Sequence, residues 1–306
     1  MKDGKESNFL SAAVYLGANA AAVPAFLDML QGQLAAHFEA YEILCVSDAQ
    51  PEGAEAAKAW AQAHPGVSLS LINMSLRQGV ELSMNAALDL AIGDFILEFD
   101  TIETPYPPKL IWQCYQKALE GHDIVTAAPK KNRRVSSRLF YRLFNAFSGS
   151  MYPLQTDLFH LLSRRAVNRL KAQTAYMPYR KAAYAASGLK LAVLRFDGPA
   201  PAAGADHSLS QALDSLALYT NAAYKFSLGL SLLLLAVTVA AAVYALILYL
   251  GAFKPIEGWT TTMLVMCGGF FGVFLILAIV LKYLSLLVEL VFRRQSYLVE
   301  SIEKLG

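Results

Sequence analysis

The chain has 306 residues, of which 56% are hydrophobic and only 16% are charged, and its mean hydropathy is +0.38. Soluble domains are about 45–50% apolar and about 25% charged, so this composition argues against an ordinary water-soluble protein. The net charge of +2 indicates no particular partner for the whole chain. The three cysteines, Cys45, Cys114 and Cys267, lack metal-ligand spacing and are expected to be free thiols in a reducing compartment.

Short apolar runs alternate with helical patterns between residues 9 and 127. Each run predicts a buried strand, and the runs are Leu10–Leu16, Glu42–Val46, Ser68–Met74, Phe95–Phe99 and Asp123–Ala127. Helices are expected between them at 23–38, 52–64, 80–91 and 107–120. This order predicts an α/β domain with a mostly parallel sheet and helices on both faces.

Ligands of such sheets bind outside the carboxyl ends of the strands. The residues that follow the predicted strands are therefore candidates for a site, namely Ser47 and Asp48, Arg77 to Gly79, Asp100 to Glu103, and Lys130 with Lys131. Neither GxGxxG nor GxxxxGK[ST] occurs, so neither a dinucleotide fold nor a P-loop is supported.

A basic segment follows the fifth predicted strand. Six Lys or Arg residues and no acidic residue lie between Lys130 and Arg142, and aromatic and aliphatic residues are interleaved with them at helical spacing. This pattern predicts an amphipathic helix over 130–149 in the membrane interface, where anionic headgroups attract basic residues. The alternative is a solvated face of a surface helix. Nucleic-acid binding is less favoured because the patch is local, and we expect no nucleic-acid partner.

Two long apolar runs lie near the C-terminus. No charged residue occurs between Lys225 and Lys254, or between Glu257 and Lys282. About 20 helical residues cross a bilayer, so the runs predict transmembrane helices at 226–252 and 259–281 rather than two buried core helices. Gly268 and Gly272 have the small-xxx-small spacing of close helix packing, which makes a homo-oligomer an expectation.

Basic residues flank the predicted hairpin on its outer sides, at Lys225, Lys282, Arg293 and Arg294. This bias places both termini and the large N-terminal domain in the cytoplasm, and no signal peptide is evident. The predicted organisation is a cytoplasmic domain over 1–200, a juxtamembrane segment over 201–225, the hairpin within 226–292 and a cytoplasmic tail over 293–306.

Several strings in this order are similar to one family. They are YEILCVSDA (41–49), SLRQGVELSMNAALDLAIGDFILEFD (75–100), SSRLFYRLFNAFSG (136–149), TDLFHLLSRRAV (156–167), and the shorter EGWTTTML and RRQSYLV near the C-terminus. The chain resembles family 2 glycosyltransferases of the GT-A fold. Within them it resembles the polyprenyl-phosphate glycosyltransferases of the dolichol-phosphate mannose synthase type, in particular the two-helix bacterial members of the inner membrane.

The resemblance implies sugar transfer from a nucleotide sugar to an undecaprenyl-like polyprenyl phosphate on the cytoplasmic leaflet, with inversion. It implies that Asp48 contacts the base or ribose, with Arg77 and Gly79 nearby, and that Asp100 is the first aspartate of the DxD motif and reaches Mg²⁺ or Mn²⁺. It assigns the acceptor phosphate to Arg134, Ser137 and Arg138. It assigns catalysis to Asp157.

The chain also departs from the family pattern. The DxD motif reads Asp100-Thr101-Ile102, so Glu103 would have to act as the second ligand. YLGAN replaces the family's YNEE, the R-x-x-G-x-S-K stretch appears as PAAGADHSLSQAL over 201–213, and His160 stands for an arginine. Two explanations remain open. Either the enzyme uses a different donor with reorganised metal binding, or the chain is a catalytically silent membrane subunit that binds a partner enzyme or a lipid phosphate.

Overall fold

The structure is a computed structural model that describes residues 4–17, 19–130, 152–173, 179–199, 258–292 and 297–306, with short groups of residues between these ranges. The chain forms two compact units. Unit 1 comprises 1–215 together with 293–306, and unit 2 comprises 216–292.

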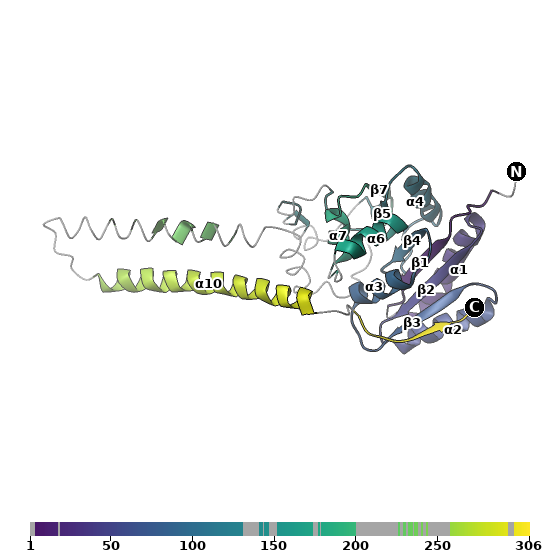
Figure 1. The fold of residues 1–306 in the computed structure, drawn as a ribbon, viewed down its shortest axis with the longest axis horizontal. Helices are drawn as coiled ribbons and strands as arrows, with labels where there is room; N and C mark the ends of the chain where they lie inside the picture. The colour runs from purple at the N-terminus through teal and green to yellow at the C-terminus, as the bar shows by residue number, and fades with distance from the viewer. Residues whose placement is uncertain are drawn as a thin grey trace. The chain divides into compact units, whose positions relative to one another are not determined.

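Unit 1 is built on one sheet, which in the described residues has eight strands in the order β7-β5-β6-β4-β1-β2-β3-β8 (Figure 1). The strands are β1 (Leu10–Tyr15), β2 (Tyr41–Ser47), β3 (Leu69–Met74), β4 (Phe95–Phe99), β5 (Ile124–Pro129), β6 (Phe159–Ser163), β7 (Leu191–Phe196) and β8 (Val299–Lys304). The helices of this unit are α1 (Val23–His37), α2 (Pro51–Ala63), α3 (Val80–Leu90), α4 (Lys109–Leu119), α6 (Arg164–Gln173) and α7 (Arg180–Ala186).

The sheet is mostly parallel, and β6 and β8 are its antiparallel members. The chain runs from β1 to β2 and β3 on one side, whereas β4 pairs with the other side of β1. The strand order therefore reverses between β1 and β4. In open α/β sheets, ligands bind in the crevice at such a reversal, outside the carboxyl ends of the strands.

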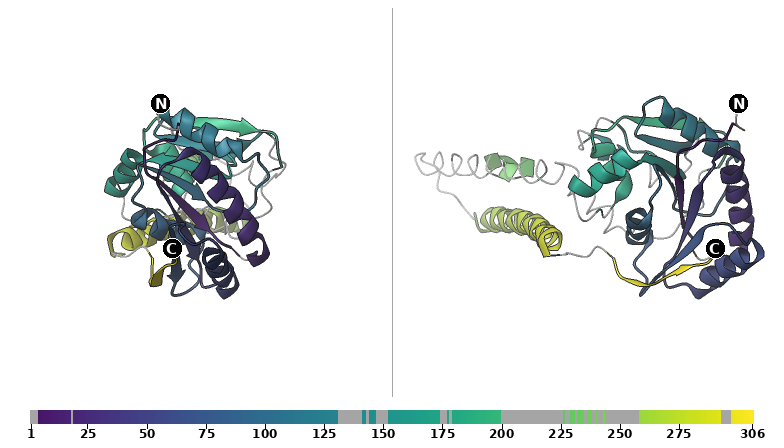
Figure 2. Two further views of the ribbon diagram at one scale, coloured as in Figure 1. Left: turned by 90° about the vertical axis from the view of Figure 1, so that its right-hand side faces the viewer. Right: turned by 45° about the vertical axis from the view of Figure 1, so that its right-hand side comes forward.

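Helices cover both faces of the sheet. α1 packs against α2 and α4 on one face, while α3 contacts β1 and β2, and α6 contacts β6, on the other (Figure 2). The five predicted strands and four predicted helices are confirmed, with ends that shift by one or two residues. Buried parallel strands read as continuous apolar runs, which explains why this part was predictable. β6, β7, β8, α6 and α7 were not predicted.

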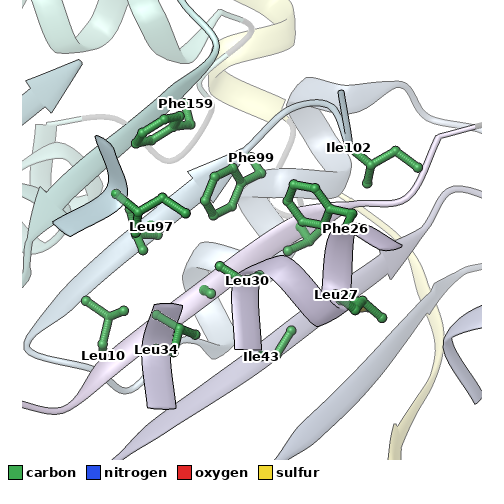
Figure 3. Packing of buried hydrophobic residues seen from close by; sticks show 14 of the residues in the cluster. Leu10, Phe26, Leu27, Leu30, Leu34, Ile43, Leu97, Phe99, Ile102 and Phe159 are labelled. Atoms are coloured by element: carbon green, nitrogen blue, oxygen red, sulfur yellow. The ribbon is translucent and has the colours of Figure 1, made fainter. Parts of the chain in front are cut away.

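One apolar cluster fills the space between the sheet and the face formed by α1, α2 and α4. It contains Leu27, Leu30 and Leu34 of α1 with Leu10 of β1 (Figure 3). Ile102 also belongs to this cluster and is 7% exposed. Ile102, which stands where the DxD motif has its second aspartate, is thus part of the core.

Unit 2 contains α10 (Trp259–Phe292), which covers the second of the two apolar runs. Over the residues that the structure describes, no helix is both long enough and apolar enough to cross a membrane. The transmembrane hairpin at 226–252 and 259–281 therefore stays a prediction.

Several predicted segments lie largely outside the described residues. Arg134, Ser137 and Arg138 fall there, as do most of the amphipathic segment 130–149 and the whole of 201–225. Their predicted roles stay predictions. The tail predicted over 293–306 contains β8, which pairs antiparallel with β3 and forms one edge of the sheet.

Candidate functional site

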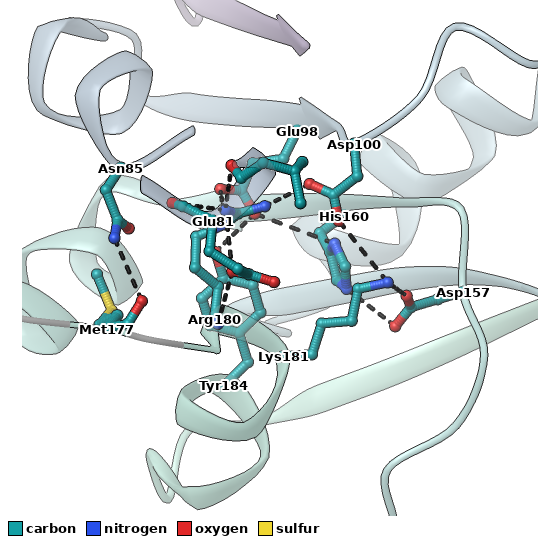
Figure 4. Close-up of polar contacts among 11 residues, drawn as sticks. Glu81, Asn85, Glu98, Asp100, Asp157, His160, Met177, Arg180, Lys181 and Tyr184 are labelled. Atoms are coloured by element: carbon teal, nitrogen blue, oxygen red, sulfur yellow. Dashed lines mark hydrogen bonds and ion pairs between the residues drawn. The ribbon is translucent and has the colours of Figure 1, made fainter. Parts of the chain in front are cut away.

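A buried cluster of charged side chains lies at the carboxyl end of β4. Glu98 points from β4 into the protein, and Asp100, two residues later, emerges on the same side because side chains alternate along a strand. His160 of β6 lies directly opposite Glu98 in the antiparallel register. Asp157 precedes β6 by two residues. Figure 4 shows these side chains converging with Arg180 and Lys181 from the start of α7.

Arg180 holds three carboxylates together. Its Nη1 contacts Glu81 Oε2 at 3.0 Å, its Nη2 donates to Asp100 Oδ1, and its Nε lies 3.4 Å from Glu98 Oε1. Nη1 also donates to the Glu81 carbonyl, and the Arg180 backbone N–H donates to Glu81 Oε2. The side chain is only 1% exposed. One guanidinium therefore joins the start of α3, the end of β4 and the start of α7.

Lys181 joins the two aspartates that the resemblance singles out. Its ammonium contacts Asp157 Oδ1 and lies 3.7 Å from Asp100 Oδ2. The other oxygen of Asp157 is 3.0 Å from His160 Nε2. Asp100 and Asp157, which are far apart in the sequence, are thus neighbours around one ammonium group.

The charges in the cluster stabilise one another. Burial would lower the pKa of Arg180 and of Lys181, but the surrounding carboxylates hold both pKa values above their usual range. Burial would raise the pKa of Asp157, but Lys181 and His160 hold it well below its usual value. For Asp100, Arg180 and Lys181 likewise outweigh burial and lower the pKa. Asp100 and Asp157 are therefore anionic at neutral pH.

Asp48, the predicted nucleotide contact, organises the loop after β3. Its Oδ1 accepts the Gln78 N–H at 2.7 Å, and its Oδ2 accepts the Gly79 N–H at 2.9 Å and the Tyr15 hydroxyl at 3.1 Å. Gly79 has φ of 85°, a conformation that favours glycine, and it is the N-cap residue of α3. Arg77 of the same loop is exposed. Asp48 thus shapes the loop on which Arg77 and Gly79 lie.

Residues 297 and 298, just before β8, also contact the loop after β3. Gln78 exchanges two hydrogen bonds with the backbone of Leu298, and the Ser75 N–H donates to the Leu298 carbonyl at 3.1 Å. The Tyr297 hydroxyl donates to Asp89 of α3 at 2.6 Å. These contacts were not predicted, because 293–306 was interpreted as a cytoplasmic tail.

The predicted nucleotide residues and the charged cluster lie at one edge of the sheet. Gly79 contacts Asp48, and Glu81, two residues further along the chain, contacts Arg180, which reaches Asp100. These contacts link Asp48 to Asp100 through Gly79, Glu81 and Arg180.

The residues around Asp100 do not fit a divalent ion. Both of its oxygens face cationic side chains, and Glu103 is exposed, with its backbone N–H donating to Thr101 Oγ1. Ile102 is in the core. Within the described ranges, no group of three or more His, Cys, Asp or Glu side chains could hold a metal ion. Hard cations need several oxygen ligands, and this cluster presents paired carboxylates instead.

Sequence reasoning identified the aspartates and missed their partners. Glu81, Glu98, Arg180, Lys181 and Tyr184 were not predicted as site residues, and His160 was noted only as a replaced arginine. One available signal was Glu98, a charged residue inside the apolar strand FILEF, which needs a buried partner. The Tyr184 hydroxyl donates to Glu98 at 2.6 Å.

Known proteins similar to this chain are glycosyltransferases. An uncharacterized glycosyltransferase of Synechocystis is 26% identical over 164 residues, which are 51% of this chain and 51% of the relative. An uncharacterized glycosyltransferase of Bacillus subtilis is 22% identical over 274 residues, 86% of this chain and 84% of the relative. The chain spans about half the length of the first relative. No protein-family model matches the chain.

Solved structures share the fold. Glucosyl-3-phosphoglycerate synthase of Mycobacterium tuberculosis, in complex with phosphoglyceric acid, has a TM-score of 0.50 and 12% identity over 69% of this chain and 78% of that chain. A mannosyltransferase of Pyrobaculum calidifontis, in complex with GDP-mannose and Mn²⁺, has a TM-score of 0.48 and 14% identity over 95% of this chain and 89% of that chain. The sequence relatives are named as glycosyltransferases, and the structure with a TM-score of 0.50 shows that this chain shares the α/β fold of that enzyme.

The Arg180 contacts predict a large loss of stability on substitution. Arg180→Met leaves three buried carboxylates without their shared cation, so the free energy of unfolding should fall by about 3–5 kcal/mol. Urea unfolding of the full chain in detergent measures the change. Arg169→Met, at an exposed position of α6, is the matched control and should change stability by less than about 0.5 kcal/mol. Equal stability of the two variants would refute the central role of Arg180.

The His160–Asp157 pair predicts a pH-dependent stability. Burial would lower the pKa of His160, but the Asp157 carboxylate and the hydrogen bond to it raise that pKa above its usual value. The resulting stabilisation is complete below about pH 6.5 and is lost as the pH rises through the raised pKa. The unfolding free energy of the native chain, relative to His160→Gln, should therefore decline as the pH rises above about 6.5. A difference that is constant across this range contradicts the assignment. His122→Gln, at the opposite edge of the sheet, is the control.

Proposed function

We propose that the protein transfers a sugar from a nucleotide-sugar donor to a polyprenyl phosphate at the cytoplasmic leaflet of a bacterial inner membrane. The observation that carries the proposal is the cluster in which Lys181 joins Asp100 and Asp157 beside the reversal of strand order. Its support comes from the GT-A type of fold, the glycosyltransferase relatives and the sequence resemblance described above.

The proposed reaction is a single displacement with inversion. An oxygen of the acceptor phosphate attacks the anomeric carbon of the sugar. The bond from that carbon to the donor diphosphate breaks, and its electron pair leaves with the nucleoside diphosphate. A phosphate monoester has a second pKa near 6, so the acceptor is already largely dianionic and needs little general-base help. The larger requirement is positive charge near the leaving diphosphate.

Asp157 has two tasks in this proposal. Its carboxylate holds the Lys181 ammonium on one side and the His160 ring on the other. An anionic Asp157 would repel an incoming phosphate if it were unpaired, but these partners offset its charge. Asp157 thus positions the cationic face of the site.

The connectivity of the chain supports the proposed membrane hairpin. Residues 216–292 leave unit 1 and return to it, since 293–306 belong to unit 1 again. A single folded unit lies on one side of a bilayer, so an inserted segment that spans the membrane must do so an even number of times. Two helices, at 226–252 and 259–281, meet this condition, and basic flanks favour the cytoplasmic side.

A second candidate is the catalytically silent subunit. The observation in its favour is that both predicted catalytic-site aspartates are already neutralised by side chains of the same chain. Such a subunit would bind a partner enzyme or a lipid phosphate without transferring sugar.

A transfer assay separates the two candidates. Full-length protein in detergent is incubated with undecaprenyl phosphate and a panel of labelled nucleotide sugars, with Mg²⁺, with Mn²⁺ and with chelator. We expect labelled lipid from at least one donor. Asp157→Asn should lower the rate by about 100-fold, in the range seen when one electrostatic contact of a transition state is removed.

Glu120→Gln is the matched control for the loss of a carboxylate. Glu120 is exposed at the end of α4, at the opposite edge of the sheet, and its loss should leave the rate unchanged. If no donor in the panel gives labelled lipid under any condition, sugar transfer to polyprenyl phosphate is rejected in favour of the silent subunit.

A further inference from the structure

The four carboxylate oxygens at the centre of the site each face a basic side chain. Asp100 faces Arg180 with Oδ1 and Lys181 with Oδ2, while Asp157 faces Lys181 with Oδ1 and His160 with Oδ2. A divalent ion would have to displace at least one of these contacts and lie next to two fixed positive charges. The metal implied by the family resemblance therefore does not fit here.

The same side chains supply the charge that a metal would bring. Arg180 and Lys181 are basic side chains with one positive charge each, and both lie against the Asp100 carboxylate. Together the two side chains carry the same formal charge as one divalent ion. The place of the second DxD ligand is taken by Ile102, whose side chain packs in the core.

We propose that Lys181, backed by Arg180, binds the diphosphate of the donor nucleotide in place of a divalent ion. The inference rests on the proposed nucleotide-sugar function and names the group that contacts the leaving diphosphate. Asp100 then serves as a ligand of an ammonium group rather than of a metal.

The geometry around Lys181 leaves room for this role. An ammonium has three N–H donors, and two carboxylates lie around that of Lys181. The side chain is 11% exposed, in contrast to the 1% of Arg180, so Lys181 is the more accessible of the two cations. It also lines a cavity of about 20 Å³ together with Thr126, Gln155 and Tyr184. That volume accommodates about one water molecule, which a phosphate oxygen could replace as the third partner.

Burial makes this cation effective and fixes its position. A lysine on the surface is a flexible, strongly hydrated point charge, whereas this one is held by two carboxylates on separate segments. Pairing in a region of low dielectric strengthens the interaction with an incoming anion. Arg180 is too deeply buried to contact the diphosphate directly, and it pairs with Oδ1 of Asp100 while Lys181 lies near Oδ2.

Equilibrium binding of UDP and GDP to the full-length protein in detergent tests the proposal. The native chain should bind one of them in excess EDTA, with an affinity within about twofold of that in Mg²⁺ or Mn²⁺. Lys181→Met should weaken this binding by about tenfold or more, the usual size of a charge-assisted contact. The corresponding nucleoside, uridine or guanosine, should bind equally to native and variant chains.

Lys190→Met is the matched control. Lys190 is exposed and directly precedes β7. Because β7 runs parallel to β5, Lys190 lies at the amino ends of these strands, whereas Asp100 lies at the carboxyl end of β4. Its loss should not change UDP or GDP affinity. Lys181→Arg keeps the positive charge and should retain EDTA-resistant binding, which separates loss of charge from loss of fold.

Two results would overturn the inference. One is that EDTA abolishes nucleotide binding to the native chain and that Mg²⁺ or Mn²⁺ restores it. This result is interpretable without any variant. The other is the absence of UDP and GDP binding under all conditions. Metal-free binding without any transfer to undecaprenyl phosphate would reject the proposed reaction and leave the inference standing, so the two failures are distinguishable.

Discussion

The buried guanidinium of Arg180 is the interaction on which the site depends. Three carboxylates from two elements would repel one another in the interior, and the cost of burying them is offset only by a cation with several well-placed donors. Arginine suits this position because its planar group reaches several acceptors at once and stays charged. By fixing the start of α7, Arg180 also positions the next residue, Lys181, between Asp100 and Asp157.

A second set of contacts positions the residues predicted to bind the nucleotide, which lie at the carboxyl ends of the same parallel strands. Asp48 gathers the N–H groups of Gln78 and Gly79, and Gln78 also exchanges hydrogen bonds with Leu298. The loop is thus fixed between β2 and the segment before β8. Because 297–306 follow unit 2, the part of the chain after the predicted hairpin contributes to the predicted nucleotide side of the site.

The sequence predicted those parts of the structure whose signals are local. Buried parallel strands leave apolar runs, and the aspartates after them could be read from their place in the pattern. β8 was missed because VESIEK has three charged residues and no apolar run, and no hairpin turn marks its partner. Arg180 was missed for a different reason. Its first carboxylate partner, Glu81, lies 99 residues earlier, and only the folded chain brings them together.

A side-chain cation and a bound metal place different constraints on a site of this kind. An exchangeable ion needs open carboxylates, which the unliganded protein must keep apart and hydrated. A lysine occupies that space permanently, so the carboxylates can be buried and paired with it. The contacts that position the cation then also stabilise the folded chain. Position 102 fits this arrangement. Ile102 belongs to the same core cluster as Phe26 and Phe99, where a carboxylate would be buried without a partner.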